Sequence, residues 1–175
     1  MTTAEDNQKP TRSRRPRWVR WSRDLILIVV VLGVIQWWQS RGLTHGKAVP
    51  LAGMRVDGSP LQVDYRDGPV LVHFWASWCP ICRVEQDTID AIAVDRAVIT
   101  VATTSGTADE VAAYLGEHGL RMPVLMDERG DIARSWGVRG VPATFIVDRS
   151  GAIRHAGMGY STGLGLRLRL WLAGL

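Results

Sequence analysis

The chain has two cysteines, Cys79 and Cys82, which lie three positions apart. If a strand over residues 70–75 is followed by a helix that begins at about Cys79, the first sulfur lies at the helix N-terminus and the second lies one turn inside. Unpaired N–H groups and the helix dipole stabilise a thiolate there, which lowers the thiol pKa below its free value of about 8.5. The spacing therefore predicts a redox pair, with Cys79 as the nucleophile and Cys82 as the shielded resolving thiol.

Other uses of two cysteines fit the sequence less well. A disulfide that closes so short a loop removes little entropy from the unfolded chain and is a weak structural staple. A zinc site needs two further Cys or His ligands, and the four histidines show no His-x(3–5)-His spacing. Haem attachment needs a His directly after the second Cys, where Arg83 stands. We therefore expect neither a resident metal nor a cofactor.

Two stretches of the sequence carry a resemblance to a known family. Residues 72–82 read VHFWASWCPIC, and residues 140–148 read GVPATFIVD. In this order they resemble the thioredoxin superfamily, and more narrowly the membrane-anchored TlpA/ResA/CcmG-like and ScsD-like bacterial thiol–disulfide oxidoreductases. The resemblance covers about residues 48–175. It implies an α/β fold, a thioredoxin-like three-layer sandwich with a central mixed sheet, whose substrates are protein thiols and disulfides.

The resemblance also implies roles for residues around the cysteines. Pro142 resembles the superfamily's cis-proline, and the backbone of Val141 before it is expected to pair with the substrate chain. Pro80 and Ile81 lie between the cysteines, where the dipeptide tunes the reduction potential. Trp78 directly precedes the nucleophile and is expected to shape the docking surface.

Three further residues lie near the dithiol in the sequence. Two of them have both a functional and a structural interpretation, and the third has a structural one. Glu85 matches an acidic position of the ResA/TlpA-like branch, where the carboxylate lies near the dithiol; it either tunes the thiol pKa or is a solvated helix residue. His73 stands where thioredoxin has a buried Asp, and is either a proton shuttle or a satisfied core histidine. Trp75 is expected to pack in the core.

The segments that position these residues alternate between strand and helix patterns. Strands are predicted at residues 70–75, 98–103, 124–126, 143–147 and 152–158, and helices at 79–94, 108–118, 131–136 and 164–172. Residues 148–151 form a hairpin turn pattern. Leucines alternate with arginines over residues 166–172, which fits a strand equally well, so the last helix rests on the family's order of elements. The alternation favours an α/β sandwich around one sheet.

The N-terminal part is basic and then apolar. Residues 1–24 hold seven basic and three acidic residues, and the remainder holds fourteen of each, so the high pI gives no reason to expect nucleic-acid binding. An Arg-rich nucleic-acid arm is the alternative reading of the tail. Residues 25–40 contain no charge. They are predicted to be a transmembrane anchor, short for a core of about 30 Å but flanked by tryptophan pairs typical of membrane interfaces.

The charge asymmetry predicts the orientation of this anchor. Basic residues precede the apolar segment, so the N-terminus is expected in the cytosol and the dithiol in the periplasm. A cleaved signal peptide is the alternative, although the bulky Trp37 and Trp38 before the faint cleavage site at Ser40 argue against it. The predicted organisation is a tail over residues 1–24, an anchor over 25–40, a linker over 41–53 and a thioredoxin-like domain over 54–175.

These features predict an inner-membrane protein-disulfide oxidoreductase that contacts the lipid bilayer. The leading hypothesis is a reductase of partner proteins in cytochrome c maturation, copper handling or stress defence, served by a membrane electron donor or acceptor. A disulfide oxidase or isomerase is the alternative within the same chemistry. A copper-binding module is a further alternative, because soft thiolates suit Cu(I). A thiol peroxidase is disfavoured, since neither cysteine has the Pro-x-x-x-Thr-x-x-Cys context.

Overall fold

The computed structural model describes residues 21, 24–31, 33–34 and 42–175. The chain divides into two units, Met1–Ile35 and Gln36–Leu175. In the first unit, residues 24–31 and 33–34 are helical and exposed. Among the residues that the structure describes, no helix is both long enough and apolar enough to cross a membrane. Most of the predicted tail, and residues 32 and 35–40 of the predicted anchor, lie outside the described residues.

The second unit alternates strands and helices along the chain. In order they are β1 (Gly46–Lys47), β2 (Ala52–Met54), β3 (Pro60–Gln62), the 3-10 helix η1 (Tyr65–Asp67), β4 (Val70–Trp75), α2 (Pro80–Ala93), β5 (Val98–Thr103), α3 (Ala108–Glu117), β6 (Val124–Asp127), α4 (Asp131–Ser135), β7 (Ala143–Val147), β8 (Ala152–Met158) and α5 (Gly163–Ala173). The elements predicted from the sequence between residues 70 and 175 are all confirmed, with ends that differ by at most one residue.

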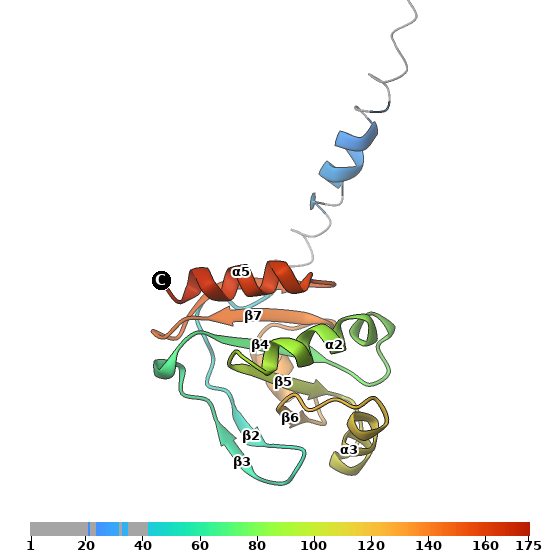
Figure 1. The fold of residues 1–175 in the computed structure, drawn as a ribbon, viewed down its shortest axis with the longest axis vertical. Coiled ribbons are helices and arrows are strands. Elements are labelled where there is room, and N and C mark those ends of the chain that lie inside the picture. Colours follow the sequence, from blue (N-terminus) through green and yellow to red (C-terminus); the bar gives the residue numbers. More distant parts are fainter. Residues whose placement is uncertain (1–20, 22–23, 32, 35–41) are drawn as a thin grey trace, which may run out of the picture. The chain divides into compact units, whose positions relative to one another are not determined.

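A mixed six-stranded sheet forms the middle of this unit, in the order β1-β8-β7-β4-β5-β6 (Figure 1). Strands β4, β5 and β6 are parallel, whereas β7 is antiparallel to both β4 and β8. All six residues of β4 are buried. A strand covered on both faces needs a continuous apolar run rather than an alternating one, and VLVHFW meets this need at every position but His73.

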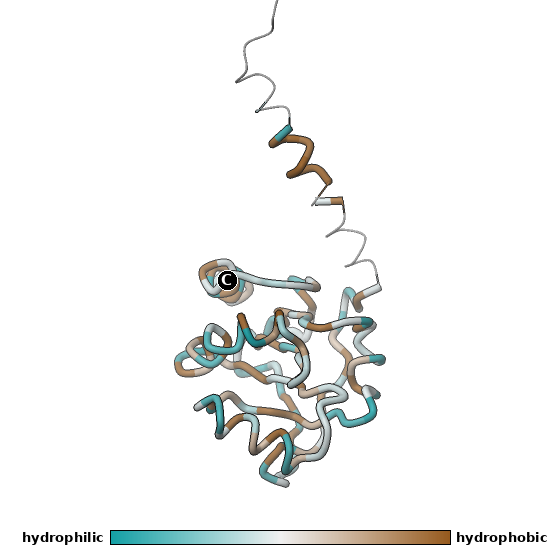
Figure 2. The backbone as a smooth tube through the Cα atoms, turned by 90° about the vertical axis from the view of Figure 1, so that its right-hand side faces the viewer, coloured by the Kyte–Doolittle hydropathy of each residue, from teal (hydrophilic) through white to brown (hydrophobic). Residues whose placement is uncertain are grey.

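Side chains of β4 alternate between two cores, one on each face of the sheet. Leu71 and Trp75 pack with residues of α2, α3 and α5, whereas Val72 and Phe74 pack with residues of α4 and the N-terminal strands. Rings of Phe74, Trp136 and Phe145 meet in the second core, with centroids 4.9–5.7 Å apart. Figure 2 shows that apolar (brown) and hydrophilic (teal) stretches alternate along the backbone of this unit. The predicted α/β sandwich with a central mixed sheet is confirmed.

The structure differs from the predicted linker over residues 41–53. Gly46 and Lys47 form β1, which pairs with β8, and β2 begins at Ala52. Leu43 and Leu51 are buried in the core on the α4 side. Strands of two or three residues are too short to show a period in the sequence, so composition alone made this segment resemble a linker. Residues 42–53 therefore belong to the folded unit.

The C-terminal segment is a helix, as the family's order of elements predicted. Thr162 is its N-cap, and the hydroxyl accepts a hydrogen bond from the Gly165 N–H. Leu166 and Leu170, one helical turn apart, are buried against the core. Arg167 forms a 2.8 Å ion pair with Asp95 just beyond α2. Helix α5 therefore lies beside α2 on the same face of the sheet (Figure 1).

Candidate active site

The two cysteines lie where β4 passes into α2. Cys79 is the N-cap of α2, and its Sγ accepts a 3.2 Å hydrogen bond from the Cys82 N–H. Pro80 occupies the first turn, where the missing N–H would have no helical partner. The two sulfurs form a disulfide, and their Cα atoms are 5.3 Å apart. After reduction, the same N–H and the helix N-terminus would stabilise a thiolate at Cys79, as the sequence predicted.

The loop before β7 lies directly against Cys79. The Val141–Pro142 peptide bond is cis. The carbonyl oxygen of Val141 lies 3.7 Å from the Cys79 Sγ, and the carbonyl oxygen of Pro142 accepts a 2.7 Å hydrogen bond from Gly159. Because β7 pairs with β4 in the sheet, the two motifs read from the sequence come together at one place.

Exposed apolar side chains surround the nearly buried sulfurs. Cys79 and Cys82 are 4% and 3% exposed, whereas Trp78 is 61% and Ile81 is 50% exposed. Pro80 is exposed between them. The disulfide is thus nearly buried and bordered by an apolar rim formed by Trp78, Pro80 and Ile81.

A loop that the sequence analysis did not single out supports this rim. The Trp78 indole donates a 3.0 Å hydrogen bond to the carbonyl oxygen of Thr104, and Ser77 makes two hydrogen bonds with Ser105. Thr104 has φ 46°, in the left-handed region that a β-branched residue rarely adopts. Nothing in the sequence marks this conformation, because glycine or asparagine would be the expected residue there.

A cavity of about 210 Å³ opens beside Trp78 and Val141. Its lining includes Thr104, Arg134 and Arg139. The Arg134 guanidinium is paired with Asp131, whereas Arg139 has no ion-pair partner among the described residues. The cavity is therefore a basic recess next to the disulfide.

Glu85 is fully buried, which excludes the reading of a solvated helix residue. It lies on the inner face of α2 with Cys82, Ile89 and Ile92, one turn beyond the resolving cysteine. One carboxylate oxygen accepts a 2.5 Å hydrogen bond from the Ser161 N–H, and the other has no hydrogen-bond partner in the described part of the chain. Burial raises the pKa of Glu85 to about 7, although the Ser161 bond opposes this. The carboxyl can thus take up or release a proton near neutral pH.

His73 is a core residue. It is 2% exposed, and its Nδ1 shares a 3.0 Å hydrogen bond with the Thr144 hydroxyl on β7. Burial lowers the pKa of His73 to about 4, so the ring is neutral near pH 7. Trp75 is also buried and packs against the ring of Tyr114, with centroids 5.5 Å apart. Both core readings are confirmed.

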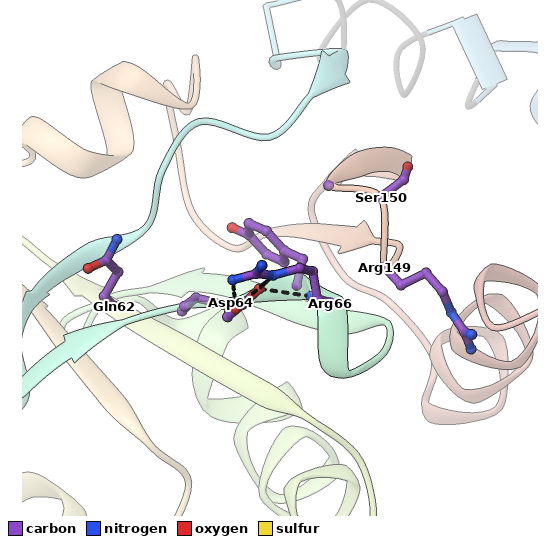
Figure 3. A pocket seen from close by; sticks show the side chains of 8 residues that line it. Gln62, Asp64, Arg66, Arg149 and Ser150 are labelled. Carbon is purple, nitrogen blue, oxygen red and sulfur yellow. Dashed lines mark hydrogen bonds and ion pairs between the residues drawn. The ribbon is translucent and has the colours of Figure 1, made fainter.

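Within the described residues, no group of three or more His, Cys, Asp and Glu side chains is arranged to hold a metal ion. A larger cavity, of about 560 Å³, lies between residues 62–66 and the 149–151 turn (Figure 3). It opens near the start of β4, whereas the disulfide follows the end of that strand. Arg66 is held there in an ion pair with Asp64, and the lining includes no cysteine. This cavity is therefore separate from the redox site.

Comparison with known proteins agrees with this geometry. The family model described as Redoxin matches residues 44–164. The chain belongs to the Redoxin family. A thioredoxin-like protein, YneN, of Bacillus subtilis is 31% identical over 153 residues, which are 78% of this chain and 89% of the relative. The resemblance to TlpA/ResA/CcmG-like proteins is thereby confirmed.

Two further relatives carry names that refer to disulfide exchange. The thiol:disulfide interchange protein HelX of Rhodobacter capsulatus is 37% identical over 108 residues, 61% of each chain. This relative is thus matched over about three fifths of its length. The crystal structure of a putative thiol:disulfide interchange protein DsbE from Chlorobium tepidum superposes with a TM-score of 0.66 at 26% identity, covering 75% of this chain and 98% of that one.

Proposed function

We propose that this protein is a thiol–disulfide oxidoreductase that reduces disulfides in partner proteins. The observation that carries the proposal is the Cys79–Cys82 disulfide at the N-terminus of α2, with the Val141 carbonyl oxygen 3.7 Å from the Cys79 sulfur. A helix N-terminus favours a thiolate, and the adjacent loop offers backbone groups to an extended substrate. The names of the relatives, which refer to thiol:disulfide interchange, support the same chemistry.

The reaction runs in two exchange steps. In the reduced protein, the Cys79 thiolate attacks one sulfur of the substrate disulfide; a mixed disulfide forms, and the other substrate sulfur leaves as a thiolate. The Cys82 thiolate then attacks the Cys79 sulfur, which forms the Cys79–Cys82 disulfide and releases the second substrate thiolate. Two electrons thus pass from the dithiol to the substrate.

We infer that Glu85 exchanges a proton with the resolving thiol of Cys82. Residues three apart on a helix lie side by side, so the Glu85 carboxyl neighbours Cys82 on the buried face of α2. The thiol of Cys82 must lose its proton before it attacks, and burial shields it from water. A carboxylate with a pKa of about 7 can accept that proton and return it when the dithiol is regenerated.

Trapping of the mixed disulfide tests the roles of the two cysteines. Cys82→Ser should accumulate mixed disulfides between Cys79 and partner proteins, because the second step is removed, while Cys79→Ser should capture nothing. The adducts are separated on non-reducing gels and identified by mass spectrometry. Capture by Cys79→Ser and none by Cys82→Ser would reverse the assignment, and capture by neither would reject exchange with proteins.

The direction of electron flow is tested by the reduction potential of the dithiol. We infer a reductase that is regenerated by a membrane electron donor, which requires a potential near the thioredoxin end of the range from about −270 to about −120 mV. Equilibration of the purified protein with glutathione buffers, read by the fraction of free thiols, gives this value. A potential near the upper end would instead assign the oxidase role.

We also propose that residues 25–40 anchor the chain in the bacterial inner membrane, with the dithiol in the periplasm. The support is the uncharged apolar segment and the excess of basic residues before it. An alkaline phosphatase fusion after Ser40 should be active, because that enzyme needs an oxidising compartment to form its disulfides. An active cytosolic reporter fused at the same position would reject this orientation.

A further inference from the structure

One side of α5 carries large apolar side chains that remain uncovered in the folded unit. These side chains are all more than half exposed and belong to Leu164, Leu168, Trp171, Leu172 and, just beyond the helix, Leu175. At about 3.6 residues per turn, such positions form one continuous stripe, which we call the α5 stripe. Leu166 and Leu170 fill the core from the other side, so α5 is apolar on more than one side. A contiguous exposed stripe of this kind marks an interaction surface.

Arginines lie on both borders of the α5 stripe. By helical spacing, Arg167 falls on one side of the stripe and Arg169 on the other. Arg167 is held by Asp95, but Arg169 has no ion-pair partner among the described residues. Long arginine side chains can extend from an apolar border toward charged groups several ångströms away.

A basic groove continues the surface beyond the end of α5. The groove measures about 690 Å³ and is lined by Arg149, Arg154 and Arg169 together with Leu172 and Leu175. Arg154 is paired with Asp148, and the described part of the chain provides no acidic partner for Arg149. The apolar stripe therefore runs into a recess lined by three arginines and by Asp148, and two of these arginines have no ion-pair partner in the described part of the chain.

The sequence shows that this charge is local. The chain beyond residue 24 has equal numbers of acidic and basic residues, yet the 27 residues after Asp148 contain four arginines and no Asp or Glu. Asp148 pairs with Arg154 and Asp95 pairs with Arg167, so two of these four arginines, Arg149 and Arg169, keep no ion-pair partner among the described residues. An apolar stripe beside a positive groove requires an occupant that is apolar and anionic at once.

We propose that the α5 stripe and the adjoining groove dock onto the surface of an anionic phospholipid bilayer. Leucines and a tryptophan flanked by arginines are the composition of helices that lie in a membrane interface. The apolar side chains would enter the boundary between headgroups and acyl chains, and Arg149 and Arg169 would meet lipid phosphates. A second copy of the chain fits less well, because a symmetric contact through this face would oppose arginine to arginine.

The two ends of α5 lie at different places relative to the dithiol. Gly174, at the end of α5, lies against Pro69 just before β4 begins. Cys79 follows the other end of β4. The groove at the C-terminal end of α5 therefore lies at the opposite end of β4 from the disulfide, whereas Ser161, just before α5 begins, bonds to Glu85 on the helix that carries Cys82.

The test uses residues 42–175, so that the proposed anchor takes no part in binding. This unit has its own two cores, and the match covers 98% of the chain in the Chlorobium crystal structure but 75% of this chain, so a chain of about this extent folds by itself. Binding is measured by co-sedimentation with vesicles of phosphatidylcholine, with and without phosphatidylglycerol. The domain should bind the anionic vesicles, bind neutral vesicles at least tenfold more weakly, and be released by high salt.

Matched variants assign the binding to this surface. Leu168→Gln with Trp171→Gln and Leu172→Gln should weaken binding on the order of 100-fold. Arg149→Gln with Arg169→Gln should weaken it roughly 20-fold, since each basic residue near an anionic surface contributes about fivefold. The controls change the same number of exposed residues elsewhere: Met54→Gln with Val84→Gln and Val94→Gln, and Arg121→Gln with Arg139→Gln, should bind as the parent does. Retained far-ultraviolet circular dichroism shows that each variant is folded.

Three results would overturn the proposal. They are absence of binding to anionic vesicles by the folded parent, equal loss of binding in the control variants, and a concentration-dependent dimer in sedimentation velocity that the α5 variants abolish. The last result would assign the stripe to a second copy. None of these results bears on the thiol chemistry, which is tested separately by trapping with Cys82→Ser.

Discussion

The carboxylate of Glu85 accepts a 2.5 Å hydrogen bond from the backbone N–H of Ser161, 76 residues further along the chain. Glu85 belongs to the inner face of α2, and Ser161 belongs to the loop between β8 and α5. One oxygen is thus fixed by the backbone, while the other remains buried without a hydrogen-bond partner in the described structure. The bond holds one oxygen of the carboxyl on the side of α2 that carries Cys82.

We predict that Glu85→Gln removes a pH-dependent step from disulfide exchange. The pKa of about 7 places the carboxyl at the midpoint of its titration near neutral pH, and glutamine cannot accept a proton. The rate at pH 7 should fall by at least tenfold, and the inflection near pH 7 should disappear. Single-turnover reduction of a peptide disulfide from pH 5 to 9 measures both. Glu117→Gln, which removes the same charge from the exposed end of α3, should keep the parent profile.

The same variant should change stability with a definite sign. The folded-state pKa of Glu85 is raised above 4.5, so its contribution to stability is present in full below pH 4.5 and is lost as the pH rises through about 7. Glutamine does not titrate. The stability of Glu85→Gln relative to the parent should therefore increase by roughly 2–3 kcal/mol between pH 4.5 and pH 8. Urea unfolding of both oxidised proteins at the two pH values gives the difference, and an unchanged difference would place the carboxyl in contact with water.

The hydrogen bond between Trp78 and Thr104 predicts a role for the indole N–H in holding the rim. Trp78→Phe keeps an apolar ring but leaves the Thr104 carbonyl without its 3.0 Å donor. We expect a loss of about 1 kcal/mol in unfolding free energy and a several-fold lower rate of exchange. Trp171→Phe is the matched control, since this ring is similarly exposed and lies outside the site. Equal effects of the two substitutions would show that the hydrogen bond has no role of its own.

The sequence alone was sufficient to predict those parts of the site that are formed by residues adjacent in the chain. The apolar run of β4, the Cys-Pro-Ile-Cys turn into α2 and the Val141–Pro142 pair follow from the residues and from their resemblance to a family. The structure brings these residues together because β7 pairs with β4. Glu85 had two open readings, because one helix in isolation does not show which of its faces is covered. Its burial depends on α5 and the loop before it, far along the chain.

Features that rest on long-range contacts were not predicted. Thr104 contacts Trp78 although the two residues are far apart in the sequence. Its positive φ could not be predicted, because threonine rarely adopts this conformation. The short strands β1 and β2 are stabilised by pairing with β8 and β3, and their own residues show no strand period. The leucine and arginine alternation of α5 was ambiguous for a similar reason, since both sides of that helix are apolar.

The basic recess beside the disulfide predicts a preference among substrates. Its lining includes Trp78, Val141 and Arg139, and the guanidinium of Arg139 has no ion-pair partner among the described residues. A peptide that pairs with the Val141 backbone would place a neighbouring side chain near this charge. Peptide disulfides with Asp next to the cysteine should therefore be reduced about fivefold faster than those with Lys, since a partly exposed ion pair contributes up to about 1 kcal/mol.

Charge reversal at this position should reverse the preference. Arg139→Glu replaces attraction of Asp by repulsion, so the ratio of kcat/KM for the two peptides should change by on the order of 20-fold in favour of Lys. Arg121→Glu makes the same change of charge outside the recess and should leave the ratio as in the parent. In the parent, high salt should make the kcat/KM values of the two peptides more alike, because a partly exposed ion pair is screened. If Arg139→Glu changes kcat/KM by the same factor for both peptides, the recess does not receive a substrate side chain. Docking then depends on the apolar rim around Trp78 and Ile81 alone.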